Sequence, residues 1–223
     1  MKGLGEAKSF LGLEIQQDKS KGEVKISQSR YIRKTIEKFG MADCKSVGTP
    51  ADLNVKLEEE IFDSMEDTTK EENDAAFKDR YLEAVGSLLY IAQLTRPDIA
   101  KSVNAVSRFC KKPKNIHWTA VKRIFRYLKG TADFCLKYSR ANKSKLLGFS
   151  DADWGNDKHD RRSISGCTFL LNGAAISWHS KKQRTTALST VEAEYIALAS
   201  TCQEAAWLEN LVREMELNHE KCE

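Results

Sequence analysis

The chain has 223 residues, a formal net charge of +4 and 30% charged residues. This length suits one or two domains, no apolar run approaches the roughly 18 residues of a membrane span, and no signal-peptide pattern opens the sequence. The cysteines are scattered without a Cys-x-x-Cys pair, which argues against a disulfide scaffold or a zinc site and indicates free thiols in a reducing, intracellular compartment.

The first 48 residues predict a β-hairpin followed by a helix. Residues 10–15 and 23–28 are strand-like, with polar turn residues between them. Apolar residues recur at helical spacing from Tyr31 to Phe39, and Gly40 is placed to end that helix. Residues 49–76 are acidic and poor in apolar side chains, which predicts a solvated linker.

Residues 77–132 predict three helices, and Gly130 suits the position just after the third. Lys122, Arg126 and Lys129 recur on one face of the third helix. A solvated helix surface and a phosphate-binding surface both fit this pattern. Because Asp133 is the only acid among the many basic residues from 101 to 145, the composition favours phosphate contacts.

Residues 133–223 predict a small sheet followed by one long helix. The strand-like runs are 146–154, 165–171 and 174–179, and the three tryptophans of this part, Trp154, Trp178 and Trp207, are expected in its core. Ser189 is a predicted N-cap, and Glu192 completes a capping box. The apolar stripe of the helix is expected to comprise Val191, Tyr195, Leu198, Cys202, Ala205, Leu208, Val212 and Met215.

Two acids of this part are candidate metal ligands. Asp151 ends the first strand, and Glu194 lies in the first turns of the helix, within the angular range of the apolar stripe. A strand end and a helix start that face each other can hold a hard divalent cation. The alternative is that Glu194 sits at the edge of the stripe and reaches water. Arg161 and Arg162 follow the strand in a polar turn, where phosphate positioning and simple solubility are equally open.

Several ordered motifs carry a family resemblance. Residues 150–155 (SDADWG), 161–166 (RRSISG), 177–178 (SW) and 189–195 (STVEAEY) resemble the ribonuclease H domain of copia-type (Ty1/copia) retrotransposon Pol polyproteins. Residues 86–90, 95–98 and 120–131 are similar to the connection region of that family. The N-terminal hairpin and helix look like the end of the reverse transcriptase palm and the start of its thumb.

The resemblance implies an α+β fold in four consecutive parts. These are the palm end and thumb start (1–48), the acidic linker (49–76), the helical connection region (77–132) and a partial ribonuclease H-like domain (133–223). The last is expected to be an incomplete RNase H-like fold of three antiparallel strands plus one long helix. Its exposed strand edge predicts a marginal, aggregation-prone half-domain.

The resemblance also implies chemistry and partners. In the family, four acids hold two Mg²⁺ ions that cleave the RNA strand of an RNA–DNA hybrid, and Asp151 and Glu194 match two of these acids. The polymerase aspartates and the later ribonuclease H acids are not in this sequence, so we expect half of a Mg²⁺ site and no activity of the chain alone.

The implied partners are an RNA–DNA hybrid or other nucleic acid, bound by Lys122, Arg126, Lys129, Arg161 and Arg162, and the rest of the Pol polyprotein. No membrane and no small-molecule substrate are expected, and the implied location is a cytoplasmic particle or the nucleus. The alternative is a catalytically dead nucleic-acid-binding remnant of a transposable element.

Overall fold

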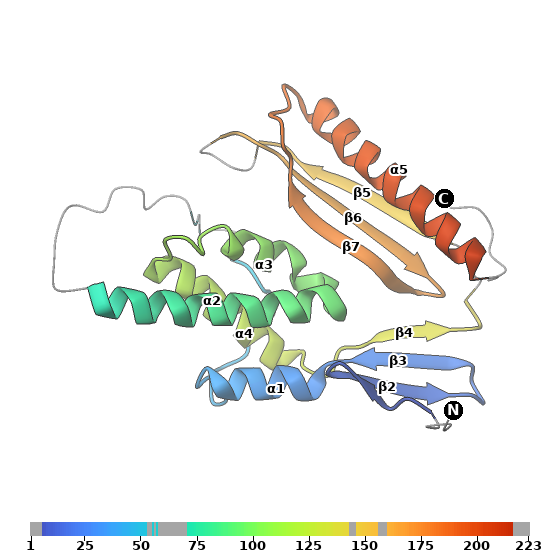
Figure 1. The fold of residues 1–223 in the computed structure, drawn as a ribbon, viewed down its shortest axis with the longest axis horizontal. Coiled ribbons are helices and arrows are strands. Elements are labelled where there is room, and N and C mark those ends of the chain that lie inside the picture. Colours follow the sequence, from blue (N-terminus) through green and yellow to red (C-terminus); the bar gives the residue numbers. More distant parts are fainter. Residues whose placement is uncertain are drawn as a thin grey trace. The chain divides into compact units, whose positions relative to one another are not determined.

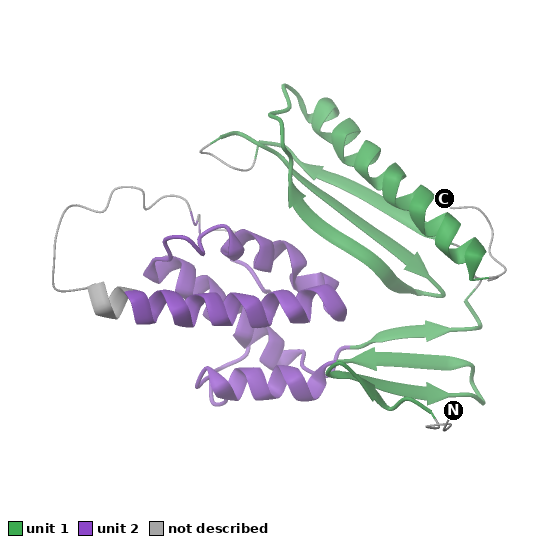
Figure 2. Cartoon of the chain, viewed as in Figure 1, with its two compact units in different colours: residues 1–27, 135–223 green, residues 28–134 purple. Residues whose placement is uncertain are grey.

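A computed structural model describes residues 6–52, 55, 57, 71–142, 146–155 and 160–215. It combines helices with two antiparallel sheets, in agreement with the predicted α+β class (Figure 1). The chain divides into two compact units, one formed by residues 1–27 with 135–223 and the other by residues 28–134 (Figure 2). We call them the sheet unit and the helical unit.

The described part of the helical unit is built around one apolar cluster to which its four α-helices contribute. Its elements are α1 (Ser29–Lys38), α2 (Glu71–Leu94), the 3₁₀ helix η1 (Pro97–Ile99), α3 (Ala100–Ser107) and α4 (Asn115–Gly130). Within this cluster Phe125 is fully covered and stacks on Phe39 with 5.1 Å between ring centroids. Such aromatic pairs add to the stabilisation that burial provides.

The end of the predicted linker differs from the sequence prediction. Helix α2 begins at Glu71, so the linker predicted to reach residue 76 ends before it. Acidic residues are favourable in the first turn of a helix, so an acid-rich stretch can be either a linker or the start of a helix. Residues 53, 54, 56 and 58–70, which carry the rest of the linker prediction, lie outside the described residues.

The two glycines expected to end helices behave differently. Gly40 follows α1 with a left-handed φ of +69°, as predicted. Gly130 is instead the last residue of α4, and Thr131 is the C-cap. A Cβ at Gly130 would meet Cβ of Ser46 at 3.1 Å, so close packing of the chain accounts for this glycine.

The first sheet of the sheet unit joins distant parts of the sequence. Its antiparallel order is β1-β2-β3-β4, with β1 (Ser9–Phe10), β2 (Leu13–Asp18), β3 (Glu23–Ser27) and β4 (Leu136–Ser139). Because β4 pairs with β3, the N-terminal hairpin belongs with the C-terminal part, whereas α1 belongs to the helical unit. The compact units therefore differ from the four consecutive segments predicted from the sequence.

The second sheet matches the predicted three strands and long helix. Its antiparallel order is β5-β6-β7, with β5 (Leu147–Asp153), β6 (Ile164–Leu171) and β7 (Ala174–Lys182), and α5 (Thr190–Glu214) follows. Asn172 and Gly173, both at positive φ, form the two-residue turn between β6 and β7. Helix α5 runs along β5 (Figure 1), and Leu208 packs on Leu146, Cys167 and Phe169.

The buried face of α5 agrees with the predicted stripe only in part. The buried residues are Ala193, Ala197, Thr201, Leu208 and Val212. Of the predicted stripe, Leu208 and Val212 are buried and Ala205 packs against the core. Val191 is 61% exposed and Tyr195 is 68% exposed, and the other predicted members Leu198, Cys202 and Met215 are exposed as well. Small side chains let the helix approach the sheet closely, and a sheet of three strands covers only one side of it.

The tryptophans and cysteines test two further predictions. Trp178 packs with Leu136 and Leu170, but Trp154 and Trp207 are exposed, so their predicted core positions are wrong. The cysteines within the described residues are free thiols, as predicted: Cys44, Cys110, Cys135, Cys167 and Cys202. No helix in the described ranges is both long and apolar enough to span a bilayer.

Candidate metal centre and nucleic-acid interface

Asp151 lies on the face of the second sheet that α5 does not cover. Along β5, side chains alternate between the two faces. A Cβ at Gly148 would meet the ring of Phe169, which packs under Leu208 of α5, so even-numbered positions of β5 face the helix. Asp151 and the 56% exposed Phe149 therefore point to the opposite face.

Glu194 is an exposed residue in the first turns of α5. That end of the helix is capped as predicted, because Ser189 Oγ accepts a bond from the backbone N–H of Glu192 at 3.1 Å. The Glu192 carboxylate accepts from the backbone N–H of Leu188 at 2.6 Å instead of that of the N-cap Ser189, so the predicted capping box is formed only in part. Glu192 is therefore engaged with the backbone, and Glu194 is exposed.

Gln183 brings the start of α5 to the end of β5. Its Nε2 donates to Ser165 Oγ and to the carbonyl of Ala193, each at 2.9 Å. Ser165 lies opposite the residue that follows Asp151, and Ala193 directly precedes Glu194. The two candidate ligands therefore lie at the same end of the sheet.

The orientation of α5 turns Glu194 toward β5. Glu204 accepts a hydrogen bond from Ser177 Oγ of β7 at 2.8 Å, so this side of the helix points toward β7. A helix turns by about 100° per residue, so Glu194 lies roughly 80° around the helix axis from Glu204, on the side of Ala205. Ala205 packs against the cluster that contains Leu146, the residue before β5.

This arrangement differs from the face-to-face geometry expected from the sequence. Asp151 points to one face of the sheet, whereas Glu194 stands on the helix that covers the other. In the described part of the second sheet, β5 is an edge strand. The two carboxylates can therefore approach one cation only around that edge. Among the residues that the structure describes, no group of three or more His, Cys, Asp or Glu side chains could hold a metal ion.

A polar cluster that the sequence did not reveal lies between the sheet and α5. Cys167 Sγ and His179 Nδ1 are 2.9 Å apart. Burial raises the pKa of the Cys167 thiol, and burial lowers the pKa of His179, although the charge of Glu204 opposes the latter shift. Both shifts favour the uncharged forms, a thiol in contact with a neutral imidazole. No local spacing in the sequence signals this contact, because it depends on the pairing register of β6 and β7.

The predicted phosphate-binding residues of α4 have different surroundings. Lys122 is exposed. Arg126 Nε donates to the carbonyl of Lys45 at 2.7 Å, and Lys129 Nζ donates to the carbonyl of Cys44 at 2.6 Å. Two of the three cations thus hold the segment after α1 in place, which leaves Lys122 as the most accessible of them.

Arg161 and Arg162 are both exposed at the start of β6. Arg161 has a left-handed φ of +57°. The backbone N–H of Arg162 donates to Asp160 Oδ1 at 3.1 Å, and Asp160 also pairs with Lys182 at 2.9 Å. Residues 156–159, the rest of the predicted polar turn, lie outside the described residues.

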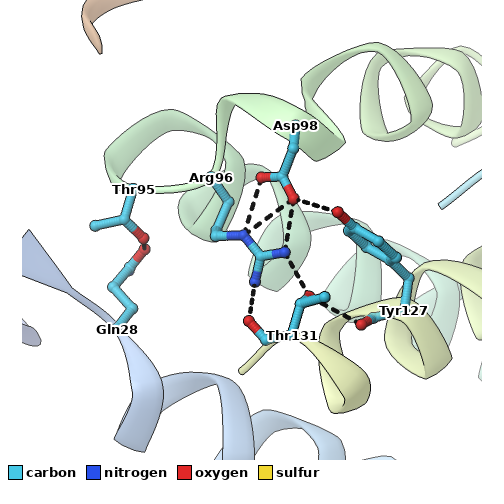
Figure 3. Close-up of polar contacts among 6 residues, drawn as sticks. All are labelled: Gln28, Thr95, Arg96, Asp98, Tyr127 and Thr131. Atoms are coloured by element: carbon cyan, nitrogen blue, oxygen red, sulfur yellow. Dashed lines mark hydrogen bonds and ion pairs between the residues drawn. The ribbon is translucent and has the colours of Figure 1, made fainter. Parts of the chain in front are cut away.

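The helical unit contains a buried cation that sequence analysis did not single out. Arg96 is 1% exposed and donates to both carboxylate oxygens of Asp98, to the carbonyl of Thr131 at 2.9 Å and to Thr131 Oγ1 at 2.6 Å (Figure 3). Tyr127 donates its hydroxyl to Asp98 at 2.8 Å. Burial opposes ionisation of Asp98, but the hydrogen bonds and charge of Arg96 outweigh it, and the pKa of Asp98 lies below its ordinary value.

The sequence of the chain is similar to those of several known proteins. The chain is 43% identical over 221 residues to the retrovirus-related Pol polyprotein from transposon TNT 1-94 of Nicotiana tabacum, covering 99% of this chain and 16% of that protein. It is 35% identical over 212 residues to the corresponding polyprotein from transposon RE2 of Arabidopsis thaliana, covering 94% of this chain and 14% of that protein. An uncharacterized mitochondrial protein of Arabidopsis thaliana is 36% identical over 208 residues, which are 93% of this chain and 80% of that protein.

The mixed helix-and-sheet chain thus aligns along nearly its whole length with transposon polyproteins. It belongs to the family of copia-type retrotransposon Pol polyproteins, as the sequence motifs predicted. The chain spans about a sixth of the length of the first of these polyproteins. No family model and no solved structure matches it.

Proposed function

We propose that this part of a Pol polyprotein holds an RNA–DNA hybrid and supplies Asp151 and Glu194 to a Mg²⁺-dependent, ribonuclease H-like site. The observation that carries the proposal is that the two acids lie at the same end of the second sheet. Helix α5 starts at the end of the sheet where β5 presents Asp151, and Glu194 is turned toward β5.

The chemistry of the two side chains suits Mg²⁺. This ion prefers carboxylate oxygens, keeps several waters and takes about six ligands in all. Asp151 and Glu194 are both exposed, so neither must lose a buried partner to bind it. When bound between substrate and carboxylates, Mg²⁺ lowers the pKa of a water and stabilises charge on a phosphoryl group. Since two carboxylates supply only part of the shell, we expect further ligands from the rest of the polyprotein and from the hybrid.

Cleavage of a labelled hybrid by a Pol protein that contains this chain tests the site assignment. Asp151→Asn and Glu194→Gln are each expected to abolish Mg²⁺-dependent cleavage of the RNA strand. Asp153→Asn, on the same strand, and Glu214→Gln, at the exposed end of the same helix, are matched controls that should leave cleavage unchanged. Equal cleavage by the Asp151→Asn, Glu194→Gln double variant would refute the assignment.

Binding of the hybrid is measured separately, through its dependence on salt. Each phosphate contact contributes about 0.9 to the slope of log affinity against log salt for duplex DNA. Lys122 is exposed, whereas Arg126 and Lys129 bond to backbone carbonyls. Lys122→Ala should therefore reduce the steepness of the salt dependence without breaking either of these bonds. Lys78→Ala, on the exposed surface of α2, is the control. An unchanged slope after replacement of all three α4 cations would show that α4 does not contact phosphate.

A second candidate function is binding of the hybrid without catalysis. Asp151 points to one face of the sheet and α5 covers the other, which favours this function because the sheet prevents direct contact between Asp151 and Glu194. This function predicts hybrid affinity that does not respond to Mg²⁺ and no cleavage by the Pol protein. Cleavage that disappears with either acid would decide for the first candidate.

A further inference from the structure

The link between β7 and α5 is anchored by one buried amide. Gln183 directly follows β7 and is 5% exposed, and its backbone N–H donates to the carbonyl of Ser163 at 2.9 Å. Its Nε2 donates to Ser165 Oγ on β6 and to Ala193 O on α5. A buried amide that bonds to two elements restrains their separation, since breaking either bond leaves polar groups unpaired in the interior.

The acceptors of these bonds stand beside the two candidate ligands. Ser165 of β6 pairs with Ala152 of β5, the residue after Asp151, and Ala193 is the residue before Glu194. We propose that Gln183 is a positioning residue, which holds Glu194 at the level of Asp151 so that both carboxylates reach one divalent cation. This inference rests on the proposed function.

A second hydrogen bond between α5 and the sheet provides a control that distinguishes positioning of Glu194 from general attachment of the helix. Ser177 Oγ of β7 donates to Glu204, ten residues after Glu194 and about 15 Å farther along the helix. Its loss loosens α5 far from the candidate site. Ser177→Ala is therefore the matched control for replacement of Gln183.

The experiment uses the 223-residue chain with Mn²⁺ as the probe, read by paramagnetic broadening of backbone NMR signals. Asp151→Asn and Glu194→Gln should each weaken Mn²⁺ binding. Gln183→Leu keeps the volume of the side chain and removes its donors. We expect it to lower Mn²⁺ affinity about tenfold, as is typical for residues that orient metal ligands. Ser177→Ala should lower the melting temperature but leave the Mn²⁺ affinity unchanged, because its bond to Glu204 lies far from the candidate ligands.

Each outcome decides a separate question. If Mn²⁺ binds equally well after both ligand substitutions, the proposed site fails and the inference with it. If Mn²⁺ does not broaden the signals of Asp151 and Glu194 in the parent chain, only the inference fails, because the proposed function draws further ligands from the rest of the polyprotein and from the hybrid. If the ligand substitutions weaken binding but Gln183→Leu does not, only the inference is overturned. Should Gln183→Leu fail to fold, Ser165→Ala takes its place, because it removes one of the two acceptors. Weaker Mn²⁺ binding by Ser165→Ala supports positioning, and unchanged affinity overturns it.

Discussion

In the helical unit, all four α-helices contribute to one buried cluster, in which Phe125 and Leu88 are completely covered. In the layer formed by β5, β6, β7 and α5, the main buried cluster is Leu146, Cys167, Phe169 and Leu208, and α5 leaves large apolar side chains such as Tyr195 and Trp207 in solvent. The two regions therefore bury their apolar side chains to very different extents.

The comparison indicates where stability resides. Burial of apolar surface is the dominant favourable term in folding, so the helical unit should be the more stable region. The layer of the second sheet depends more on polar contacts: Gln183 and Glu204 join the strands to the helix, and His179 contacts Cys167 between β7 and β6. The unpaired edge of β5 in the described part of that sheet adds an exposed ladder of backbone groups.

The sharpest test compares a covered with an uncovered aromatic side chain. Phe125→Ala should lower the free energy of unfolding by about 3–5 kcal/mol, because it opens a cavity in the helical core. Trp207→Ala, at a side chain that is 57% exposed, should change it by less than about 0.5 kcal/mol. Urea denaturation followed by circular dichroism measures both. A large cost for Trp207→Ala would show that the outer face of α5 is covered in solution.

The buried cation of the helical unit should contribute the next largest effect. Arg96→Met removes charge-assisted hydrogen bonds to Asp98 and Thr131, which should cost about 2 kcal/mol. Arg33→Met is the control, since its ion pair with Asp133 is exposed and should contribute less than about 1 kcal/mol. Equal effects in urea denaturation would contradict a special role for burial at Arg96.

Loss of the α5 N-cap should have a smaller effect, confined to the sheet unit. Ser189→Ala removes the bond to Glu192 N–H and should cost about 1 kcal/mol. Faster amide exchange in the first turn of α5, with unchanged exchange in α2 and α4, is the expected readout. Ser200→Ala, in the middle of the same helix, is the control and should not accelerate exchange.

The smallest effect is a difference in pH dependence between the regions. The pKa of His179 lies below its ordinary value of 6.5, so the unfolded chain takes up a proton first as pH falls, and the sheet layer loses stability below about pH 6.5. The pKa of Asp98 lies below 3.8, so the helical unit keeps this contribution until pH falls below about 4.

Amide exchange measured against pH in each region checks this order. His179→Gln should remove the loss near pH 6.5, although its neighbours Cys167, Glu204 and Lys181 remain. Loss of protection in both regions over the same pH range would contradict the assignment of the two groups.

Local signals in the sequence were reliable for the elements themselves. Helical spacing and Gly40 predicted α1, the turn after β6 contains the favourable Asn172-Gly173 pair, and Ser189 was a correct N-cap. Each depends on residues within a few positions of one another, so the sequence alone contains the physical cause. The family motifs, which include Asp151 and Glu194, were likewise visible without coordinates.

Tertiary structure decided which surfaces these elements bury. Both faces of α5 carry apolar residues, and only the contact with the second sheet determined that Ala193 and Ala197 face inward while Tyr195 faces solvent. The pairing of β3 with β4, the bonds of Arg126 and Lys129 to the segment after α1, and the bridge of Gln183 to α5 likewise join residues far apart in the chain. Burial and hydrogen bonding depend on the partner that the fold supplies, and short-range patterns contain no information about that partner.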